Sequence, residues 1–427
     1  MKRILVACVL GLGAAGLFAA ELRPTRIAVK AVRLIDGISD RPLSPAVVLI
    51  ENGRIVAVGP TLAVPSDARV IDLGGATLLP GLIDAHDHLT SIPENSGYNG
   101  LAVSVPREAL HGAASARKTL DAGFTSVRNV FANGYSDVAL RDAIQAGEIP
   151  GPRLLVSGPG LGITGGHCDT NLLPPEFGFK EAGIADGPWE ARAKVREVVK
   201  YGADLIKLCA SGGVLSKGDH PGTPQYTPDE MKAITEEAHR LGRKVAAHAH
   251  GTQSIKEAIL AGVDSIEHAS LIDDEGIRLA KEHGTFLVMD IYNDDFILQQ
   301  GLRVGMLPEA IEKEKLIGRL QRENFQRAVR GGARMAFGTD GGVYPHGDNA
   351  KQFAYMVQYG MTPMQAIQAA TVNAAELMGW RELVGSIEPG RYADLIAVAG
   401  DPLADIRSLE KVGFVMKGGE IVKNTLK

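Results

Sequence analysis

Two histidines, one residue apart, are the first sign of chemistry in this chain. His86 and His88 stand at the end of a short apolar run that is predicted to be a β-strand, residues 82–88. On a strand, residues i and i+2 point to the same face, about 7 Å apart along the backbone. Both imidazoles could therefore bind one metal ion. A His-x-His pair alone is weak evidence, because two core or surface histidines have the same spacing.

Four more ligand-type side chains follow later apolar runs. They are His248, His250, His268 and Asp340. If these runs are parallel strands, their carboxyl ends meet at one face of the fold, where barrel enzymes build their active sites. Five histidines and an aspartate at the ends of four strands are hard to explain as coincidence. We therefore expect a metal centre there.

Lys207 is unusual because it lies inside the apolar run 205–209. A lysine buried in a parallel strand is costly unless its charge is compensated. One interpretation is a buried salt bridge to Asp87 or Asp340. The other is that carbon dioxide converts the amine to a carbamate, whose two anionic oxygens could bridge two divalent ions.

The elements that would position these residues follow from a repeated pattern. Helical stretches end in a glycine and are followed by a short apolar run at Gly123, Gly202, Gly242, Gly262, Gly284 and Gly332. Such a glycine provides the left-handed residue that ends many helices. Strands alternating with helices indicate a parallel sheet. With the runs at 82–88 and 154–157, about eight units over roughly 300 residues predict an α/β fold, a (βα)8 TIM barrel. A doubly wound open sheet is the alternative.

The two ends of the chain carry short β-rich runs separated by turns. This pattern covers residues 27–80, with the hairpin dipeptide Asn52-Gly53, and residues 385–422. Neither segment is long enough to form a stable β layer alone, so we expect both ends to form one small β-sandwich. The predicted domains are residues 21–80 and 379–427 for the two parts of the sandwich, and 81–378 for the barrel.

Composition and charge exclude several classes of protein. Hydrophobic residues make up 45% and charged residues 22% of the 427 residues, which does not fit a disordered chain. The formal net charge of −5 argues against nucleic acid or an anionic membrane as a partner. Lys2 and Arg3, the apolar residues 4–17 and the small residues that follow predict a signal peptide over residues 1–20. We therefore expect a periplasmic or secreted protein; an uncleaved anchor is the alternative.

Beyond that segment the chain has two cysteines, Cys168 and Cys209. Two cysteines are too few for a disulfide framework, even in an oxidising compartment. We interpret both as small buried hydrophobic side chains.

Over nearly its whole mature length, the chain resembles the amidohydrolase superfamily. The resemblance rests on LPGLIDAHDH at residues 79–88 and GSIEPGRYADL at residues 385–395. It implies two divalent metal ions, usually Zn²⁺. By position, one ion would be held by His86, His88 and Asp340, the other by His248 and His268, and a bridge would be formed by Lys207 carboxylated by carbon dioxide.

The spacings of these ligands are most similar to those of the prolidase-like and Xaa-Arg/Lys carboxypeptidase branch, which includes a bacterial enzyme that cleaves ochratoxin A. The resemblance implies hydrolysis of an amide bond to a C-terminal amino acid, in a small-molecule or dipeptide-like substrate with a free carboxylate. Ochratoxin A, cleaved to phenylalanine and ochratoxin alpha, would be included. Asp340 would move the proton from the attacking water to the leaving amine. A homo-oligomer such as an octamer is also implied.

Three further residues are candidates for substrate binding. His167 lies in a glycine-rich loop after the third predicted strand, and an exposed loop histidine is the alternative. Tyr226 precedes a predicted helix and would bind a carboxylate or pack under its loop. His250 would polarise the scissile carbonyl or help to hold that carboxylate. Arg128-Asn129 stands where many relatives have Arg-Asp, which leaves its role open.

The loops also bear on the side chain of the released residue. A pocket for arginine or lysine needs an acid, and the candidates are Glu94, Asp169, Asp290 and Asp294. An uncharged slot could instead be formed by Ile92, Tyr98, Leu161, Ile163, Ile291 and Tyr292. The charged candidates alone do not decide the question, but together with the resemblance to the ochratoxin-cleaving enzyme these apolar groups favour the uncharged slot and release of phenylalanine.

Two other functions compete with this one. The first is hydrolysis of a cyclic amide, or an imidazolonepropionase-like reaction. The second is a noncatalytic metal-binding barrel, and the complete ligand set with an acid at Asp340 argues against it.

Overall fold

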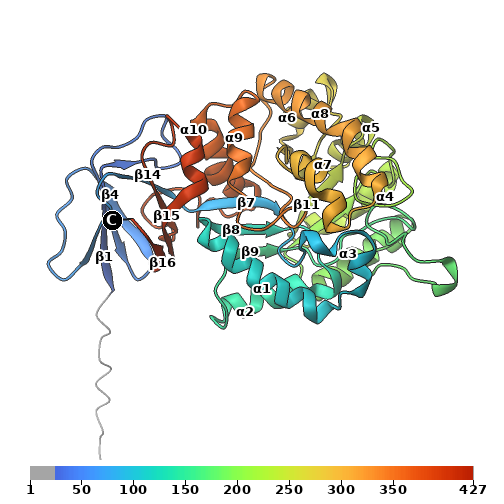
Figure 1. Cartoon of the computed structure of the whole chain (residues 1–427), viewed down its shortest axis with the longest axis horizontal. Coiled ribbons are helices and arrows are strands. Elements are labelled where there is room, and N and C mark those ends of the chain that lie inside the picture. Colours follow the sequence, from blue (N-terminus) through green and yellow to red (C-terminus); the bar gives the residue numbers. More distant parts are fainter. Residues whose placement is uncertain (1–24, 427) are drawn as a thin grey trace, which may run out of the picture.

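The computed structural model describes residues 25–426, so the predicted signal peptide lies outside the described residues. Figure 1 shows two parts: strands surrounded by helices, and a smaller β-rich part that contains strands from the start and from the end of residues 25–426. None of the helices within residues 25–426 has the length and apolar character needed to cross a membrane.

The larger part is built on parallel strands. One sheet contains β7 (Leu82–Asp87), β8 (Phe124–Asn129) and β9 (Arg153–Val156) in that order. A second contains β10 (Leu205–Cys209), β11 (Lys244–Ala249), β12 (Ser265–His268) and β13 (Phe286–Val288). Isolated parallel bridges link these sheets at Leu161–Leu208, Leu287–Met335 and Asp87–Gly341. Parallel pairing therefore continues from β7 to β13 and returns to β7.

The eighth predicted strand, at residues 335–337, is irregular. Ala336 N–H donates to the Leu287 carbonyl on β13, and Ala85 N–H on β7 donates to the Phe337 carbonyl. The Phe337 N–H, however, donates to Ala369 in a π-helical turn (Ala369–Asn373). Because the Phe337 N–H is bonded outside the sheet, residues 335–337 bridge β13 and β7 without forming a regular strand.

Helices connect the parallel strands and surround them (Figure 1). They are α1 (Val105–Asp121), α2 (Ser136–Gln145), α3 (Pro188–Lys200), α4 (Pro228–Arg240), α5 (Thr252–Leu260), α6 (Asp274–His283), α7 (Asn293–Val304), α8 (Pro308–Arg330), α9 (Lys351–Gln358), α10 (Pro363–Gln368) and α11 (Ala374–Leu377). All six glycines of the repeated pattern have positive φ, from 68° at Gly332 to 103° at Gly202. The prediction that glycine would provide the left-handed residue is confirmed at each of them.

The smaller part contains two sheets. The first has the order β4-β3-β1-β5, from β1 (Arg26–Ala31), β3 (Ala46–Glu51), β4 (Arg54–Gly59) and β5 (Arg69–Asp72). The second has the order β16-β15-β14-β6-β2, from β2 (Arg33–Leu34), β6 (Ala76–Pro80), β14 (Leu395–Ala399), β15 (Val412–Lys417) and β16 (Glu420–Asn424). Antiparallel pairing of β6 with β14 joins the two ends of the chain, and one hydrophobic cluster contains residues of both sheets.

This smaller part holds the start of β7, the first strand with candidate ligands. β6 runs into β7 through Gly81, whose N–H donates to the Asp394 carbonyl at 2.8 Å. A Cβ at Gly81 would lie 2.0 Å from the Thr125 hydroxyl oxygen on β8. Glycine is therefore required where β7 begins, and the carboxyl end of β7 is brought to His86 and His88.

Candidate metal centre

A cavity of about 950 Å³ opens at the carboxyl ends of the parallel strands. Its lining includes all the predicted metal ligands, which are His86, His88, Lys207, His248, His268 and Asp340. His167 and His250 line it as well. The structure thus brings together side chains from β7, β10, β11, β12 and the segment that follows residue 337.

His86, His88 and Asp340 form the first ligand group. Oδ1 of Asp340 lies 3.4 Å from Nε2 of His86 and 3.0 Å from Nε2 of His88. Ligand atoms that each lie about 2.0 Å from one ion are about 3.3 Å apart in a tetrahedral site. Nε2 of His86 is buried and has no hydrogen-bond partner within residues 25–426. A divalent ion would satisfy this nitrogen, so the donor set fits a metal.

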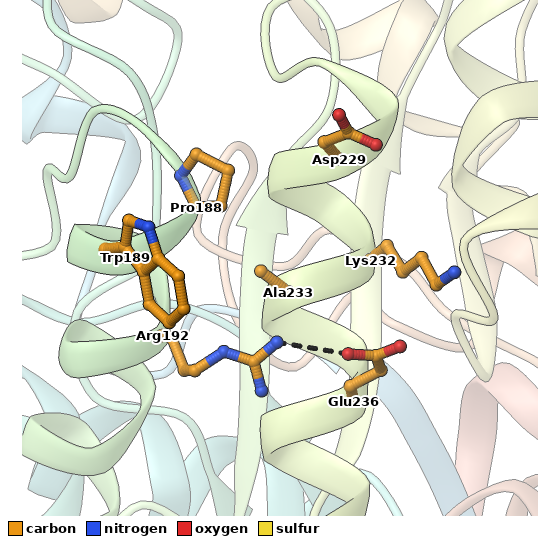
Figure 2. A pocket seen from close by; sticks show the side chains of 7 residues that line it. All are labelled: Pro188, Trp189, Arg192, Asp229, Lys232, Ala233 and Glu236. Carbon is orange, nitrogen blue, oxygen red and sulfur yellow. Dashed lines mark hydrogen bonds and ion pairs between the residues drawn. The ribbon is translucent and has the colours of Figure 1, made fainter.

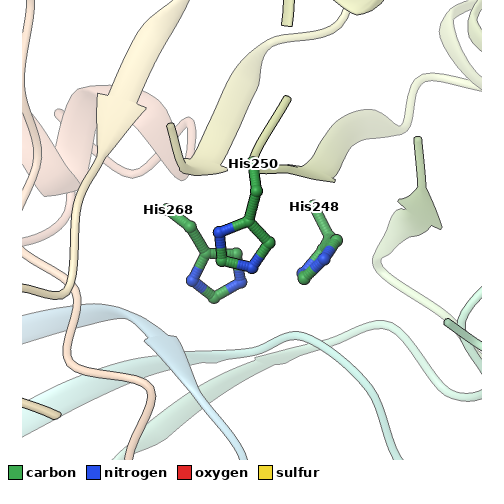
Figure 3. A group of neighbouring side chains, drawn as sticks. All are labelled: His248, His250 and His268. Carbon is green, nitrogen blue, oxygen red and sulfur yellow. The ribbon is translucent and has the colours of Figure 1, made fainter. Parts of the chain in front are cut away.

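The second group is formed by His248, His250 and His268, whose ligand atoms lie within 4.8 Å of one another. Figure 3 shows the three rings converging, with His250 stacked over His268 at 4.8 Å between ring centres and 14° between planes. Burial lowers the pKa of all three imidazoles well below the usual value. Neutral imidazole is the form that binds metals.

Two of these candidate ligands have unusual backbone conformations. The φ angles of His268 and Asp340 are 67° and 58°, in the left-handed region that residues other than glycine rarely adopt. Such conformations cost about 1–3 kcal/mol each and concentrate at functional sites. Both residues line the cavity, so these rare conformations occur at two of the candidate metal ligands.

Asp290 supports the second group, a role that the sequence analysis did not assign to it. Its Oδ1 lies 2.8 Å from Nδ1 of His268, and its Oδ2 accepts from Asn293, which also donates to Asp340 at 3.3 Å. Burial and the nearby Asp340 carboxylate raise the pKa of Asp290 to about 8. Its position two residues beyond β13 was the available signal, because active-site residues gather at such strand ends.

Glu267 on β12 is a carboxylate that the sequence analysis did not name. Its Oε2 lies 2.8 Å from Nδ1 of His86, and its Oε1 accepts from Arg128 at 2.8 Å. Although burial opposes ionisation, the Arg128 guanidinium and the hydrogen bond to His86 hold the pKa of Glu267 below its ordinary value. Arg128, whose role was left open, thus neutralises this buried acid. Its neighbour Asn129 accepts the Leu89 N–H at 2.7 Å and so holds the loop after β7.

Lys207 is only 3% exposed, as the apolar run predicted. No carboxylate oxygen of residues 25–426 lies within 4.0 Å of its Nζ, so the buried salt bridge to Asp87 or Asp340 is not observed. Burial lowers the pKa of the Lys207 amine to about 8. The fraction of neutral amine, the form that reacts with carbon dioxide, is therefore larger than for an exposed lysine.

His167 lies against the second ligand group. Its ring stacks on His248 with 4.0 Å between centres and 21° between planes. Nδ1 lies 2.8 Å from the Ser216 hydroxyl oxygen, and the backbone N–H donates to the Gln225 side chain at 2.9 Å. Burial lowers the pKa of His167 to about 4. The side chain is half-buried at the cavity wall, where its role in substrate binding stays a prediction.

Tyr226 has a different place from the one expected for a substrate ligand. The residue is 1% exposed and does not line the cavity. Its hydroxyl donates to the Gly162 carbonyl at 2.9 Å and lies 3.2 Å from the Ala185 carbonyl. The proposed carboxylate-binding role of Tyr226 is therefore wrong, and the alternative of packing under the loop is correct.

The two cysteines also differ from expectation. Both are buried, as predicted, but they form a disulfide, Cys168–Cys209. Their separation of 41 residues along the chain gave no sign of this pairing. The fold brings the loop after β9 against the end of β10, and both cysteines line the cavity.

The cavity wall is not built from the loop residues that the sequence suggested. None of the six residues expected to form an uncharged slot lines the cavity; these are Ile92, Tyr98, Leu161, Ile163, Ile291 and Tyr292. Among the four acids expected near the released side chain, only Asp290 lines it. Its apolar lining instead includes Leu101, Val103, Val105, Phe131, Leu172, Leu173, Phe177, Phe179, Val214, Leu215, Ile297 and Val343. Glu108, Glu181 and Glu314 also line the cavity. Leu161 and Ile291 pack in the core instead, because a loop sequence does not reveal which side chains face inward.

A second pocket, of about 300 Å³, lies on the surface between α3 and α4. Figure 2 shows its side chains, among them Trp189 and an ion pair of 3.0 Å between Arg192 and Glu236. None of the candidate metal ligands lines it. The chemistry therefore belongs to the large cavity.

Comparisons with known proteins agree with the geometry. The amidohydrolase family profile matches residues 77–422. The chain is 35% identical to ochratoxinase of Aspergillus niger over 90% of this chain and 84% of that protein. A crystal structure of a Xaa-Pro dipeptidase with bound methionine superimposes with a TM-score of 0.86 and 37% identity, over 93% of this chain and 99% of the other. An imidazolonepropionase of Geobacillus kaustophilus is more distant, at 27% identity over 88% of this chain and 90% of that protein.

Proposed function

This chain belongs to the amidohydrolase family, and from that premise we propose that it is a binuclear metal-dependent hydrolase that releases a C-terminal amino acid from an amide-linked substrate. The observation that carries the proposal is the convergence of six ligand-type side chains, from five separate segments, on one cavity. The continuous parallel pairing from β7 back to β7 supports a (βα)8 barrel as the frame. The two sheets that share one hydrophobic cluster support a β-sandwich made by both chain ends.

His86, His88 and Asp340 would hold one ion, most simply Zn²⁺, and His248 and His268 the other. Lys207, carboxylated on Nζ, would bridge them. Two observations on residues 25–426 support this assignment: the buried Lys207 amine has no carboxylate within 4.0 Å, and the buried Nε2 of His86 has no hydrogen-bond partner. Bound ions supply an activated water near neutral pH and polarise the carbonyl that it attacks.

The chain's own residues would then move protons and orient the substrate. Oδ1 of Asp340 faces His86 and His88, while Asn293 donates to its Oδ2 at 3.3 Å. Held in this way, Asp340 would accept the proton of the attacking water and return it to the leaving nitrogen. His250 is anchored through Nδ1 by the Ser270 hydroxyl at 2.7 Å, so its Nε2 would meet the carbonyl or the carboxylate of the substrate.

The cavity wall supports an apolar substrate. Phe131, Phe177 and Phe179 lie among the side chains that line it. A volume of about 950 Å³ falls in the range of cavities that bind drug-sized ligands. The relative named ochratoxinase points in the same direction, so we infer that ochratoxin A is cleaved to phenylalanine and ochratoxin alpha. Because apolar and aromatic side chains form a large part of the wall, N-acyl-phenylalanines should be cleaved too.

Cyclic amide hydrolysis or an imidazolonepropionase-like reaction remains the second candidate. It has less support, since its relative is 27% identical, whereas the ochratoxinase is 35% identical. The two reactions give different products. Hydrolysis of an amide linked to an amino acid yields an amine and a carboxylate on separate molecules. Hydrolysis of a cyclic amide yields a single molecule that carries both groups.

We further propose that the protein works outside the cytoplasm, as the predicted signal peptide implies. The Cys168–Cys209 disulfide supports this, because structural disulfides persist in oxidising compartments.

The experiment is a comparison of kcat/KM for one aromatic acyl group joined in turn to Phe, Leu, Pro, Arg and Lys, with product detection by mass spectrometry. Phe should give the highest value. A tenfold advantage for Arg or Lys, about 1.4 kcal/mol in transition-state binding, would contradict the proposed preference. Absence of any free amino acid product, with turnover of cyclic amides, would favour the second candidate.

A further inference from the structure

The Cys168–Cys209 disulfide lies in the wall of the active-site cavity. Both cysteines line the cavity, and they are only 5% and 2% exposed. Cys168 directly follows His167. Cys209 is the last residue of β10, two residues after Lys207, and pairs in register with His248 on β11. One covalent bond therefore links the loop that carries His167 to the strands that carry two candidate ligands.

The hydrogen bonds of His167, unlike its ring stacking on His248, are made to a different loop. Its backbone N–H and its Nδ1 contact Gln225 and Ser216, which both belong to the long loop between β10 and α4. The Ser216 hydroxyl in turn donates to Asp219 of the same loop at 2.6 Å. These hydrogen bonds hold the two loops together, and the disulfide fixes the loop that carries His167 to the end of β10, where the second loop begins.

Two glycines leave room for the side chains of Cys168 and His167. A Cβ at Gly162 would lie 2.6 Å from Cβ of Cys168, and a Cβ at Gly213 would lie 2.1 Å from Cε1 of His167. Glycine at these positions lets both side chains pack closely, so a small displacement of Cys168 would change the stacking of His167 on His248. A cross-link removes such displacements by restricting the conformations of the segment that it closes.

We propose that the Cys168–Cys209 disulfide is a positioning element of the substrate site, which holds His167 against His248. This inference rests on the proposed function, because His167 is taken to bind substrate. Opening the bond requires a dithiol reductant, which passes two electrons and two protons to the sulfurs and leaves as its own cyclic disulfide. Two cysteine thiols result, the loop loosens, and substrate affinity falls while the metal ligands stay on their strands.

The test uses the full mature chain and compares wild type with Cys168→Ala/Cys209→Ala on an N-acyl-phenylalanine substrate. KM should rise about fivefold or more, with kcat changed less than about twofold, as expected when ground-state and transition-state binding are lost together. Metal content should match that of wild type. An unchanged KM, or a loss of metal equal to the loss of activity, would overturn the proposal.

A double-mutant cycle separates positioning from general stabilisation. If the disulfide acts through His167, the triple variant His167→Ala/Cys168→Ala/Cys209→Ala should have the same KM as His167→Ala alone. Fully additive effects would overturn the proposal.

Two measurements on wild type do not depend on the variant folding. Reduction of the Cys168–Cys209 disulfide should increase the rate of amide hydrogen exchange in residues 163–169. Reoxidation should return both the exchange rate and KM to their original values. Unchanged exchange in the reduced protein would overturn the proposal. If wild type shows no turnover of any amide, the proposed function has failed, whereas turnover with an unchanged KM in the variant shows that the inference alone has failed.

Discussion

Nδ1 of His86 lies 2.8 Å from Oε2 of Glu267, and both side chains are fully buried. Since the carboxylate accepts the Nδ1 proton, Nε2 is the nitrogen left to bind a metal. A carboxylate behind a histidine ligand fixes the ring and raises its basicity. Arg128, which donates to the other oxygen of Glu267, keeps this acid ionised. Arg128, Glu267 and His86 therefore form a buried, hydrogen-bonded chain of side chains behind the proposed metal centre.

The first prediction concerns this chain. Glu267→Gln should lower metal affinity by about 10- to 100-fold, because the amide no longer accepts the Nδ1 proton as strongly. Equilibrium dialysis with Zn²⁺ and metal analysis would measure this. Glu282→Gln, on the exposed face of α6, is the matched control and should bind metal as wild type does.

The same substitution leaves Arg128 without its partner, and an uncompensated buried charge costs about 3–5 kcal/mol. Arg128→Met/Glu267→Gln should recover much of that stability in denaturant unfolding without recovering metal affinity. Wild-type affinity in the double variant would show that Glu267 matters for folding alone.

The second prediction is that Lys207→Ala loses at least one metal ion and nearly all activity, because the bridging group is gone. Short carboxylates added to the buffer should restore part of the activity by occupying the space of the carbamate. Lys200→Ala, at the exposed end of α3, is the control. Full metal content and full activity in Lys207→Ala would refute the bridging assignment.

The third prediction is that the substrate needs a free α-carboxylate. C-terminally amidated N-acyl-phenylalanine should have a kcat/KM at least tenfold lower than the free acid, a difference of about 1.4 kcal/mol. His167→Asn should raise KM more than it lowers kcat, if His167 binds substrate and transition state alike. Equal rates for amide and acid would show that no carboxylate site exists.

The fourth prediction follows from the revised role of Tyr226. Tyr226→Phe should leave KM unchanged, because its hydroxyl meets backbone carbonyls and not the cavity. The loss of the hydroxyl, which donates to the Gly162 carbonyl and lies beside the Ala185 carbonyl, should lower the free energy of unfolding by about 1–3 kcal/mol. Urea denaturation with steady-state kinetics measures both, and a raised KM at unchanged stability would contradict the structure.

The sequence alone indicated which ligand-type side chains to expect at strand ends, and that short apolar strands alternate with helices. His86, Lys207, His248, His268 and Asp340 were identifiable because polar or charged residues end or interrupt apolar runs, where burial has a high cost unless a function requires it. The six glycines after helices marked the helix ends, since a left-handed residue is a local requirement that the chain must meet in its own sequence.

Only the tertiary structure decided which side chains meet across the fold. Glu267 and Arg128 come from different strands, Cys168 and Cys209 from a loop and a strand, and nothing in their local sequence specifies these pairings. The direction of loop side chains was equally hidden, so the expected slot residues were wrong and Tyr226 turned out to be a packing residue. Strand positions alternate by a fixed rule, whereas a loop side chain points wherever its contacts with distant segments place it.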